Sequence, residues 1–191
     1  VLALAQHTPE TAAHTPRHAL PIPIRIAFLD ETGAIVPTKL AKDALAKHEH
    51  MVLLTKDQQD LPIYAVNASG LTPSILRNFS APVTIDDDLS RDERHRIIRH
   101  DTDLFNRWDN AQTLISEEIL AVATNPSALM NTSSIAALAD GFGHILEDPL
   151  CLDYFKAAIL TLPAISILES YITPADPVDL FNARLAIETV L

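Results

Sequence analysis

Cysteine is almost absent from this chain of 191 residues, and glycine is scarce. The single cysteine, Cys151, excludes an internal disulfide and is typical of a reducing compartment, so we expect a cytoplasmic location. Because Leu150 and Leu152 flank it, we expect Cys151 to be a small buried side chain rather than a nucleophile. The glycines at positions 70, 141 and 143 fit neither the G-x-S-x-G elbow of serine hydrolases nor a P-loop.

Basic residues are also few. Lys and Arg together number 14 against 25 Asp and Glu, which gives a formal net charge of −11. A surface of this sign repels nucleic acid and anionic membranes, so neither is an expected partner. No segment approaches the run of about 18 apolar residues that a membrane span requires.

Apolar residues, in contrast, are plentiful. They make up 48% of the sequence and the mean hydropathy is +0.14, which predicts a folded chain. The length suits one large or two small domains. Residues 1–7 are apolar but lack a basic region, so they do not resemble a signal peptide. Because the helical pattern near residue 191 has no stop signal, we expect the chain to be a fragment of a longer polypeptide.

The first half, residues 1–88, has the pattern of short strands. Residues 21–29 alternate apolar and other side chains and lead into a turn at residues 30–33, where Gly33 supplies positive φ. Further strands are expected at residues 51–55, 61–66 and 82–86, with a polar connection at 56–60 and a loose loop at 8–18. This spacing predicts a small immunoglobulin-like β-sandwich.

The second half, residues 89–191, has helical periodicity. Ser90 and Glu93 form a capping-box pattern that predicts a helix start. One apolar stripe is predicted along the following helix, made by Leu104, Trp108, Ala111, Ile115, Ile119 and Val122. Asp-Pro pairs at residues 148–149 and 176–177 each predict a further helix start. The expected fold class is therefore α+β: a β-sandwich followed by an all-α bundle or solenoid-like domain.

No catalytic, cofactor-binding or metal-ligating residue is predicted. The nearest approach to a zinc motif is His48-Glu49-His50, but H-E-x-x-H needs a histidine at position 52, where the chain has Val52. On a strand the two histidines could supply two ligands, and no third ligand is evident. We expect solvated polar residues there.

Two ordered motifs distinguish the chain. The first is F-S-A-P-V at residues 79–83, and the second is D-x-D-x-F-N-R-W at residues 101–108. Together they resemble the junction between the third and fourth domains of the bacterial aminopeptidase N family, which are zinc exopeptidases of the gluzincin type. The residues that carry this structural signature are Phe79, Ser80, Pro82, Asp101, Asp103, Phe105, Arg107 and Trp108.

The resemblance implies what the chain would do. The parent enzyme would bind zinc and remove N-terminal residues from peptides, while this chain would hold neither zinc nor catalytic groups and would be inactive alone. It would scaffold the catalytic domain of the same polypeptide and help to wall the peptide-access cavity. Peptide substrate would bind only in the intact enzyme. Apolar surface left by truncation would lead the fragment to self-associate.

Two alternatives remain open at this stage. Arg107 and Trp108 could line a substrate channel; we favour Trp108 as a core anchor and Arg107 as a buried partner of Asp101 or Asp103. The whole chain could instead be a free-standing protein-interaction module, which an intact gene start with no upstream zinc domain would favour. An independent hydrolase is disfavoured because no nucleophile, base and orienting group come together in the sequence.

Overall fold

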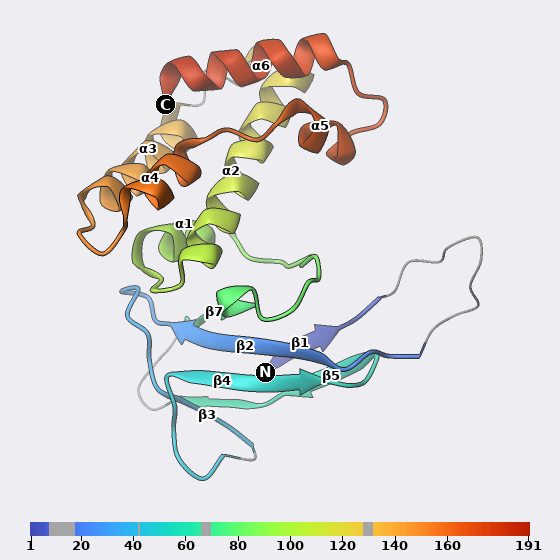
Figure 1. Ribbon diagram of the computed structural model, residues 1–191, viewed down its shortest axis with the longest axis vertical. Coiled ribbons are helices and arrows are strands. Elements are labelled where there is room, and N and C mark those ends of the chain that lie inside the picture. The colour runs from blue at the N-terminus through green and yellow to red at the C-terminus, as the bar shows by residue number, and fades with distance from the viewer. Residues whose placement is uncertain (8–17, 42, 66–69, 128–131) are drawn as a thin grey trace. The chain divides into compact units, whose positions relative to one another are not determined.

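The computed structural model describes residues 1–7, 18–41, 43–65, 70–127 and 132–191. The chain divides into two compact units, Val1–Asp87 and Asp88–Leu191, which are described separately. The first unit contains the strands and the second contains the long helices (Figure 1). The α+β class expected from the sequence is confirmed. The expected loop at residues 8–18 lies outside the described residues except for its last position.

In its described residues the β unit contains seven short strands and one 3-10 turn. Their bounds are β1 Leu2–Ala5, β2 Ile22–Leu29, β3 Thr38–Leu40, β4 Glu49–Leu54, β5 Gln58–Leu61, β6 Ile63–Ala65, β7 Thr72–Ile75 and η1 Arg77–Phe79. They pair antiparallel in the orders β1-β5, β4-β2-β7 and β3-β6. The strand β2 is therefore the central strand of the largest sheet.

Buried and exposed side chains alternate along β4, which shows which face of the sheet packs against the core. His50, Val52 and Leu54 are buried, while Met51 and Leu53 point outward and are exposed. The register pairs Ile24 with Val52, which places both apolar side chains on the buried face. A one-residue slip would turn this face to solvent, so the apolar pattern fixes the pairing.

The turn after β2 forms as the sequence predicts. Gly33 has φ +86°, and its amide donates to the carbonyl of Asp30 at 3.0 Å. The Asp30 carboxylate also accepts from the amides of Thr32 and Ala34. These hydrogen bonds, above all the one from the Thr32 side chain, hold the pKa of Asp30 below its usual value.

Two strand predictions were wrong. Residues 82–86 form no strand; the amide of Val83 donates to the carbonyl of Ala81, and this tight turn leaves no ladder to a neighbour. The last strand before this segment is β7, which pairs with β2. The supposed polar connection at 56–60 contains most of β5, because backbone pairing with β1 stabilises a strand whose side chains are largely exposed.

The helical unit contains six helices in its described part. Their bounds are α1 Arg91–His100, α2 Leu104–Thr124, α3 Thr132–Glu147, α4 Asp153–Leu160, α5 Ile165–Leu168 and α6 Pro177–Val190, with a 3-10 turn η3 Glu169–Tyr171 after α5. No helix in the described part of the chain is both long and apolar enough to cross a membrane.

The core of this unit forms around the 21-residue helix α2. Ala111, Leu114, Ile115 and Ile119 on α2 have no exposed surface. They pack in one cluster with Ile98 of α1, with the α3 stripe that includes Leu138 and Ile145, and with Leu180, Ala183 and Ile187 of α6. Each fully buried Leu or Ile contributes about 1.5–3 kcal/mol relative to an exposed one, so the apolar stripe stabilises the unit.

Helix starts follow the predicted caps in two of three places. Ser90 and Glu93 form the full capping box of α1, and Asp176 caps α6 with Pro177 in its first turn. The helix start predicted at Asp148 was wrong, because α4 begins at Asp153. The Asp148 carboxylate accepts from the Leu150 amide and from Arg107, so residues 148–151 form a turn instead.

Candidate functional site

The D-x-D-x-F-N-R-W motif builds the corner between α1 and α2. Asp101 is the last cap residue of α1, and its Oδ1 accepts from the amide of Asp103 at 2.9 Å. Asp103 is the N-cap of α2, where its Oδ1 accepts from the amide of Asn106 at 2.9 Å and from the Asn106 side chain at 3.0 Å. Both aspartates are buried. Carboxylates satisfy the free amides of a helix start, so the motif encodes a tight reversal between two helices.

Arg107 ties this corner to the loop after α3. Its Nε donates to the carbonyl of Ile98 at 2.9 Å, and its Nη1 donates to Oδ2 of Asp148 at 2.7 Å. The side chain is buried, as the sequence analysis favoured, but its ion-pair partner is Asp148 rather than Asp101 or Asp103. The expected partners were wrong because both aspartates take part in the helix corner. The Arg107 guanidinium, together with the Leu150 amide, holds the pKa of Asp148 below its usual value.

Cys151 lies beside this ion pair. Its thiol is buried, as predicted, and Nη1 of Arg107 lies 3.2 Å from its Sγ. Burial raises the pKa of Cys151 despite the nearby guanidinium. A thiol whose pKa is raised is mostly protonated at neutral pH and is a poor nucleophile, so Cys151 fits a packing role.

Trp108 is not the core anchor that the sequence favoured. Its side chain is 37% exposed, and its ring centroid lies 6.2 Å from that of Phe105, one turn earlier on α2. Leu104, Ala111 and Ile115 still line the inner face of the helix or pack against it. The prediction failed because a tryptophan at the margin of an apolar stripe can bury only one side of its ring.

The first motif, F-S-A-P-V, lies where the β unit ends. Ser80 Oγ accepts from the backbone amide of Arg25 at 3.0 Å, which fastens this segment to β2. Phe79 and Pro82 are exposed, and Ala81 between them is buried. Leu76, Asn78 and Phe79 all have φ between +48° and +57°, so the motif follows a run of left-handed backbone that is costly for side-chain-bearing residues.

His48, Glu49 and His50 do not come together as a site. His50 is buried; its Nδ1 lies 2.9 Å from Asp43 Oδ2 and its Nε2 lies 2.9 Å from Thr38 Oγ1. His48 is exposed. The expectation of solvated polar residues was therefore wrong for His50. The Asp-His-Thr order copies the connectivity of a hydrolase triad, but Thr38 has no exposed surface, so no substrate can reach its hydroxyl.

Glu49, between these histidines, connects its own strand β4 to strand β2 and to the 3-10 turn η1. Its carboxylate lies 3.3 Å from Arg25 Nη1 on β2 and 2.9 Å from Arg77 Nε after β7. Arg77 is buried and also donates to Ser74 Oγ at 3.0 Å. The side chains of Glu49 and His50 therefore take part in ion pairs and hydrogen bonds that hold the β unit together.

The donor set does not fit zinc. Among the described residues, no group of three or more His, Cys, Asp and Glu side chains lies close enough to hold a metal ion. Both ring nitrogens of His50 already have protein partners. A tetrahedral zinc site requires at least three protein ligands, which this arrangement does not supply.

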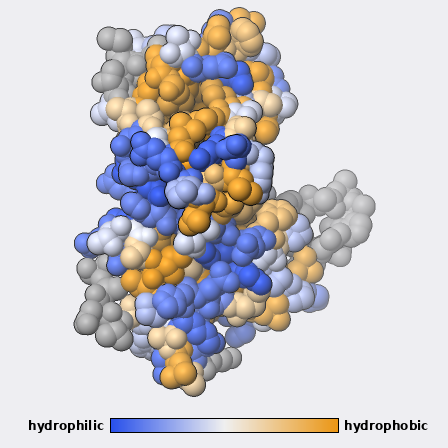
Figure 2. All heavy atoms as spheres, turned by 60° about the vertical axis from the view of Figure 1, so that its left-hand side comes forward, coloured by the Kyte–Doolittle hydropathy of each residue, from blue (hydrophilic) through white to orange (hydrophobic). Residues whose placement is uncertain are grey.

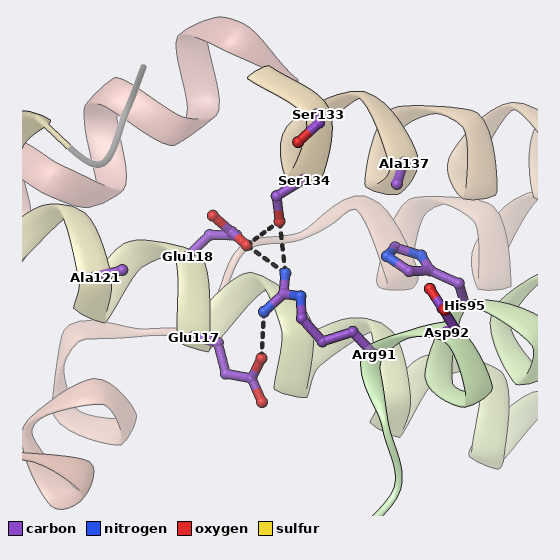
Figure 3. A pocket seen from close by; sticks show the side chains of 9 residues that line it. All are labelled: Arg91, Asp92, His95, Glu117, Glu118, Ala121, Ser133, Ser134 and Ala137. Atoms are coloured by element: carbon purple, nitrogen blue, oxygen red, sulfur yellow. Dashed lines mark hydrogen bonds and ion pairs between the residues drawn. The ribbon is translucent and has the colours of Figure 1, made fainter. Parts of the chain in front are cut away.

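The helical unit contains a pocket between α1, α2 and α3. Its volume is about 570 Å³, and it is lined by Arg91, Asp92, His95, Glu117, Glu118, Ala121, Ser133, Ser134 and Ala137 (Figure 3). Arg91 reaches across from α1 and pairs with Glu117 at 2.5 Å and with Glu118. Ser134 of α3 bonds to both Arg91 and Glu118. This network links the three helices.

His95 has an unusual environment in this pocket. Only 7% of the residue is exposed, and its Nδ1 has no hydrogen-bond partner. Burial, and secondarily the charges of Arg99 and Arg91, hold the pKa of His95 below its usual value. The ring is therefore neutral at pH 7 and keeps one nitrogen lone pair as an acceptor.

No motif or spacing in the sequence predicts this pocket. Arg91 and Glu118 are separated by 27 positions, and Arg91 and Ser134 by 43. Their meeting depends on the packing of three helices, and no local spacing reports it. The one signal present was the position of Arg91 directly after the N-cap Ser90, which places it at the open end of α1.

The fold and the site define a class of protein: a small antiparallel β unit that precedes an all-helical unit. The chain belongs to the DUF3458 family of domains of unknown function. Residues 1–88 match its Ig-like fold, and residues 91–191 match its C-terminal part with ARM repeats. The predicted immunoglobulin-like and solenoid-like folds are thereby confirmed.

The curated relatives that match the chain include two bacterial enzymes named aminopeptidase N. The chain is 26% identical over 190 residues to aminopeptidase N of Escherichia coli, covering 100% of this chain and 21% of that protein. It is 38% identical over 111 residues to aminopeptidase N of Caulobacter vibrioides, covering 58% of this chain and 12% of the relative. The resemblance to the aminopeptidase N family is thus confirmed, and the chain spans about a fifth or less of these relatives.

A solved structure shares the fold. The crystal structure of Legionella pneumophila aminopeptidase A in complex with aspartic acid matches with a TM-score of 0.67 and 24% identity. The match covers 87% of this chain and 18% of the other. At this identity the similarity supports the fold alone.

Proposed function

We propose that the chain is a non-catalytic region of a zinc-dependent aminopeptidase N that removes N-terminal residues from peptides. The observation that carries the proposal is the match along the whole chain to one continuous fifth of the Escherichia coli enzyme. In this proposal zinc and peptide bind elsewhere in the intact enzyme, and the enzyme works in the reducing cytoplasm.

Exposed apolar side chains support a scaffolding role. On β4, Met51 and Leu53 point to solvent. The face of the molecule in Figure 2 also shows apolar patches among the polar surface. Surface of this kind is typical of contacts with other protein. We propose the catalytic domain of the same polypeptide as the partner, with the helical unit forming part of the wall of the peptide-access cavity.

Helix α6 has an outer apolar face in addition to its buried one. Val178, Phe181 and Leu185 follow i, i+3, i+7 spacing and are all exposed. Without a partner this face costs free energy in water, so the isolated chain would self-associate through it. In the intact enzyme the same face would pack against further protein.

A segment exchange tests this function. The matching segment of the Escherichia coli enzyme is replaced by this chain, and the product is compared with an enzyme from which the segment is deleted. We expect the exchanged enzyme to keep zinc and to hydrolyse an alanine chromogenic amide, whereas the deletion loses both stability and turnover. A fully active deletion would contradict the scaffolding role.

The exchange needs a matched pair of variants. Phe181→Ser removes an exposed apolar side chain from α6, and Thr189→Ser changes an exposed residue of the same helix conservatively. If α6 contacts further protein, only the first should lower the melting temperature of the exchanged enzyme. Equal melting temperatures would show that this face makes no such contact.

A further inference from the structure

Two histidines meet where the end of α1 lies against α3. His100 is the last residue of α1 and His144 belongs to α3; their ring centroids are 6.1 Å apart and their planes are tilted by 52°. The two helices pack closely here, since a Cβ at Gly141 would lie only 3.2 Å from Cγ2 of Ile98. Neither histidine has a role in the aminopeptidase proposal, on which this contact does not depend.

An ion pair crosses between the same two helices. Nη2 of Arg99 on α1 lies 2.6 Å from Oδ2 of Asp140 on α3. The same oxygen lies 3.9 Å from Nε2 of His144, four positions later on α3. A protonated His144 is a charged donor and competes with Arg99 for this oxygen. Protonation therefore draws Asp140 toward its own helix and away from α1.

The charges that surround His100 oppose its protonation. Partial burial of the ring, and then the charge of His144, hold the pKa of His100 below its usual value of 6.5. Three arginines add positive charge around the ring: Arg99 and Arg96 on α1, and Arg107 on α2. A proton on His100 thus enters a region that is already positive.

The other charged groups around this contact have separate roles. Asp101 and Asp103 accept from backbone amides of the α1–α2 corner, and Asp148 pairs with Arg107. Glu147 is exposed at the end of α3, where water screens its charge. Lys156 of α4 donates to the carbonyl of Leu146. Asp140 is therefore the carboxylate whose pairing across the helices depends on a histidine.

We propose that the His100–His144 contact is pH-sensitive: it holds the end of α1 against α3 while both rings are neutral, and it loosens when both gain protons. Histidine is the side chain that ordinarily changes its charge between about pH 5 and 8. With both protons present, His144 offsets the charge of Asp140 on α3, while His100 adds a second cation to Arg99 on α1. Repulsion then replaces attraction between the helices.

The direction and size of the effect follow from the charges. Because the pKa of His100 is lowered in the folded chain, stability is lost as the pH falls below 6.5, and the loss is complete below the folded-state pKa. Two unit charges at the ring separation of 6.1 Å change an equilibrium constant by about threefold in water, and by more at a lower dielectric constant.

A double-mutant cycle on the 191-residue chain tests the proposal. His100→Gln and His144→Gln are made singly and together, and hydrogen exchange gives the opening constants of the amides of residues 138–145 at pH 8 and pH 5. The coupling factor is the product of the wild-type and double-variant constants divided by the product of the single-variant constants. It cancels the separate contribution of His95, whose pKa is also lowered.

We expect a coupling factor near one at pH 8 and a factor of about three or more, in the direction of easier opening, at pH 5. The same coupling factor at both pH values overturns the proposal. Far-UV spectra of the variants report whether each remains folded.

An NMR titration of the ring protons provides a second measurement. His144→Gln removes a neighbouring charge and should raise the pKa of His100. His48→Gln makes the same change at an exposed histidine of the β unit and should leave the pKa of His100 where it is. A pKa of His100 that is the same in both variants would contradict the proposal.

Discussion

Arg107 of α2 and Asp148, 41 positions later, form an ion pair whose Nη1–Oδ2 distance is 2.7 Å. The pair fastens the start of α2 to the turn that follows α3, and the same guanidinium reaches the carbonyl of Ile98 at the end of α1. One buried side chain thus connects three helices. The arginine of the signature motif therefore has a structural explanation that requires no contact with substrate.

Replacing Arg107 should destabilise the helical unit. Arg107→Ala leaves the Asp148 carboxylate without its cation and opens a void, so we expect a loss of about 3 kcal/mol in the free energy of unfolding, measured by urea denaturation. Glu188→Gln, which breaks an exposed pair with Arg184, should cost less than about 1 kcal/mol. In the intact enzyme, loss of turnover by Arg107→Ala with an unchanged melting temperature would contradict this structural role.

The same pair makes stability depend on pH. The Arg107 side chain lowers the pKa of Asp148 from 3.8, so ionised Asp148 stabilises the folded chain above that pH. This contribution is lost as the pH falls through the lower, folded-state pKa. We expect the difference in unfolding free energy between wild type and Asp148→Asn to be constant from pH 7 to about 5 and to shrink below about 4. A difference that grows at acid pH would reverse the sign and contradict the assignment.

The capping box at the start of α1 should contribute measurably to the free energy of unfolding. Ser90 accepts from the Glu93 amide while Glu93 reaches back to the Ser90 amide. Ser90→Ala should therefore lower the free energy of unfolding by about 1 kcal/mol. Thr189→Ala removes a hydroxyl from the exposed side of α6 and should change it by less than about 0.5 kcal/mol. Similar effects for the two variants would show that the cap contributes little.

Trp108 gives a direct optical test of its position. It is the single tryptophan of the chain and is 37% exposed. Acrylamide should therefore quench the fluorescence of the folded chain efficiently, with only a modest further increase after unfolding. Because self-association would cover the Trp108 ring, the measurement is made at low protein concentration. Fluorescence that is protected from quencher until the chain unfolds would place Trp108 in the core.

The helical half was largely predictable because its signals are local. Ser90 with Glu93, and Asp176 with Pro177, identify helix starts within four residues of sequence. The stripe from Ala111 to Val122 identifies the buried face of α2. The helix start predicted at Asp148 was wrong because an Asp-Pro pair is also typical of a turn. The Asp148 carboxylate accepts from the distant Arg107 and from the Leu150 amide instead of capping a helix.

The strand half was harder to predict because a strand needs a partner. Residues 82–86 have β-forming side chains but no neighbouring ladder, whereas the polar β5 is paired with β1. Likewise, burial of His50 depends on Thr38 and Asp43 on another segment. The pocket around His95 is an extreme case, since its residues come from three helices and only tertiary packing assembles them.

Whether this chain supplies structure and no chemistry can be tested on one purified preparation. Turnover of an alanine or leucine chromogenic amide is measured after zinc supplementation, and bound zinc is determined on the same sample. We predict no turnover and no stoichiometric zinc. Turnover that a chelator abolishes, together with about one zinc per chain, would contradict the account, and four-coordinate zinc would then require ligands beyond the pair His48 and His50.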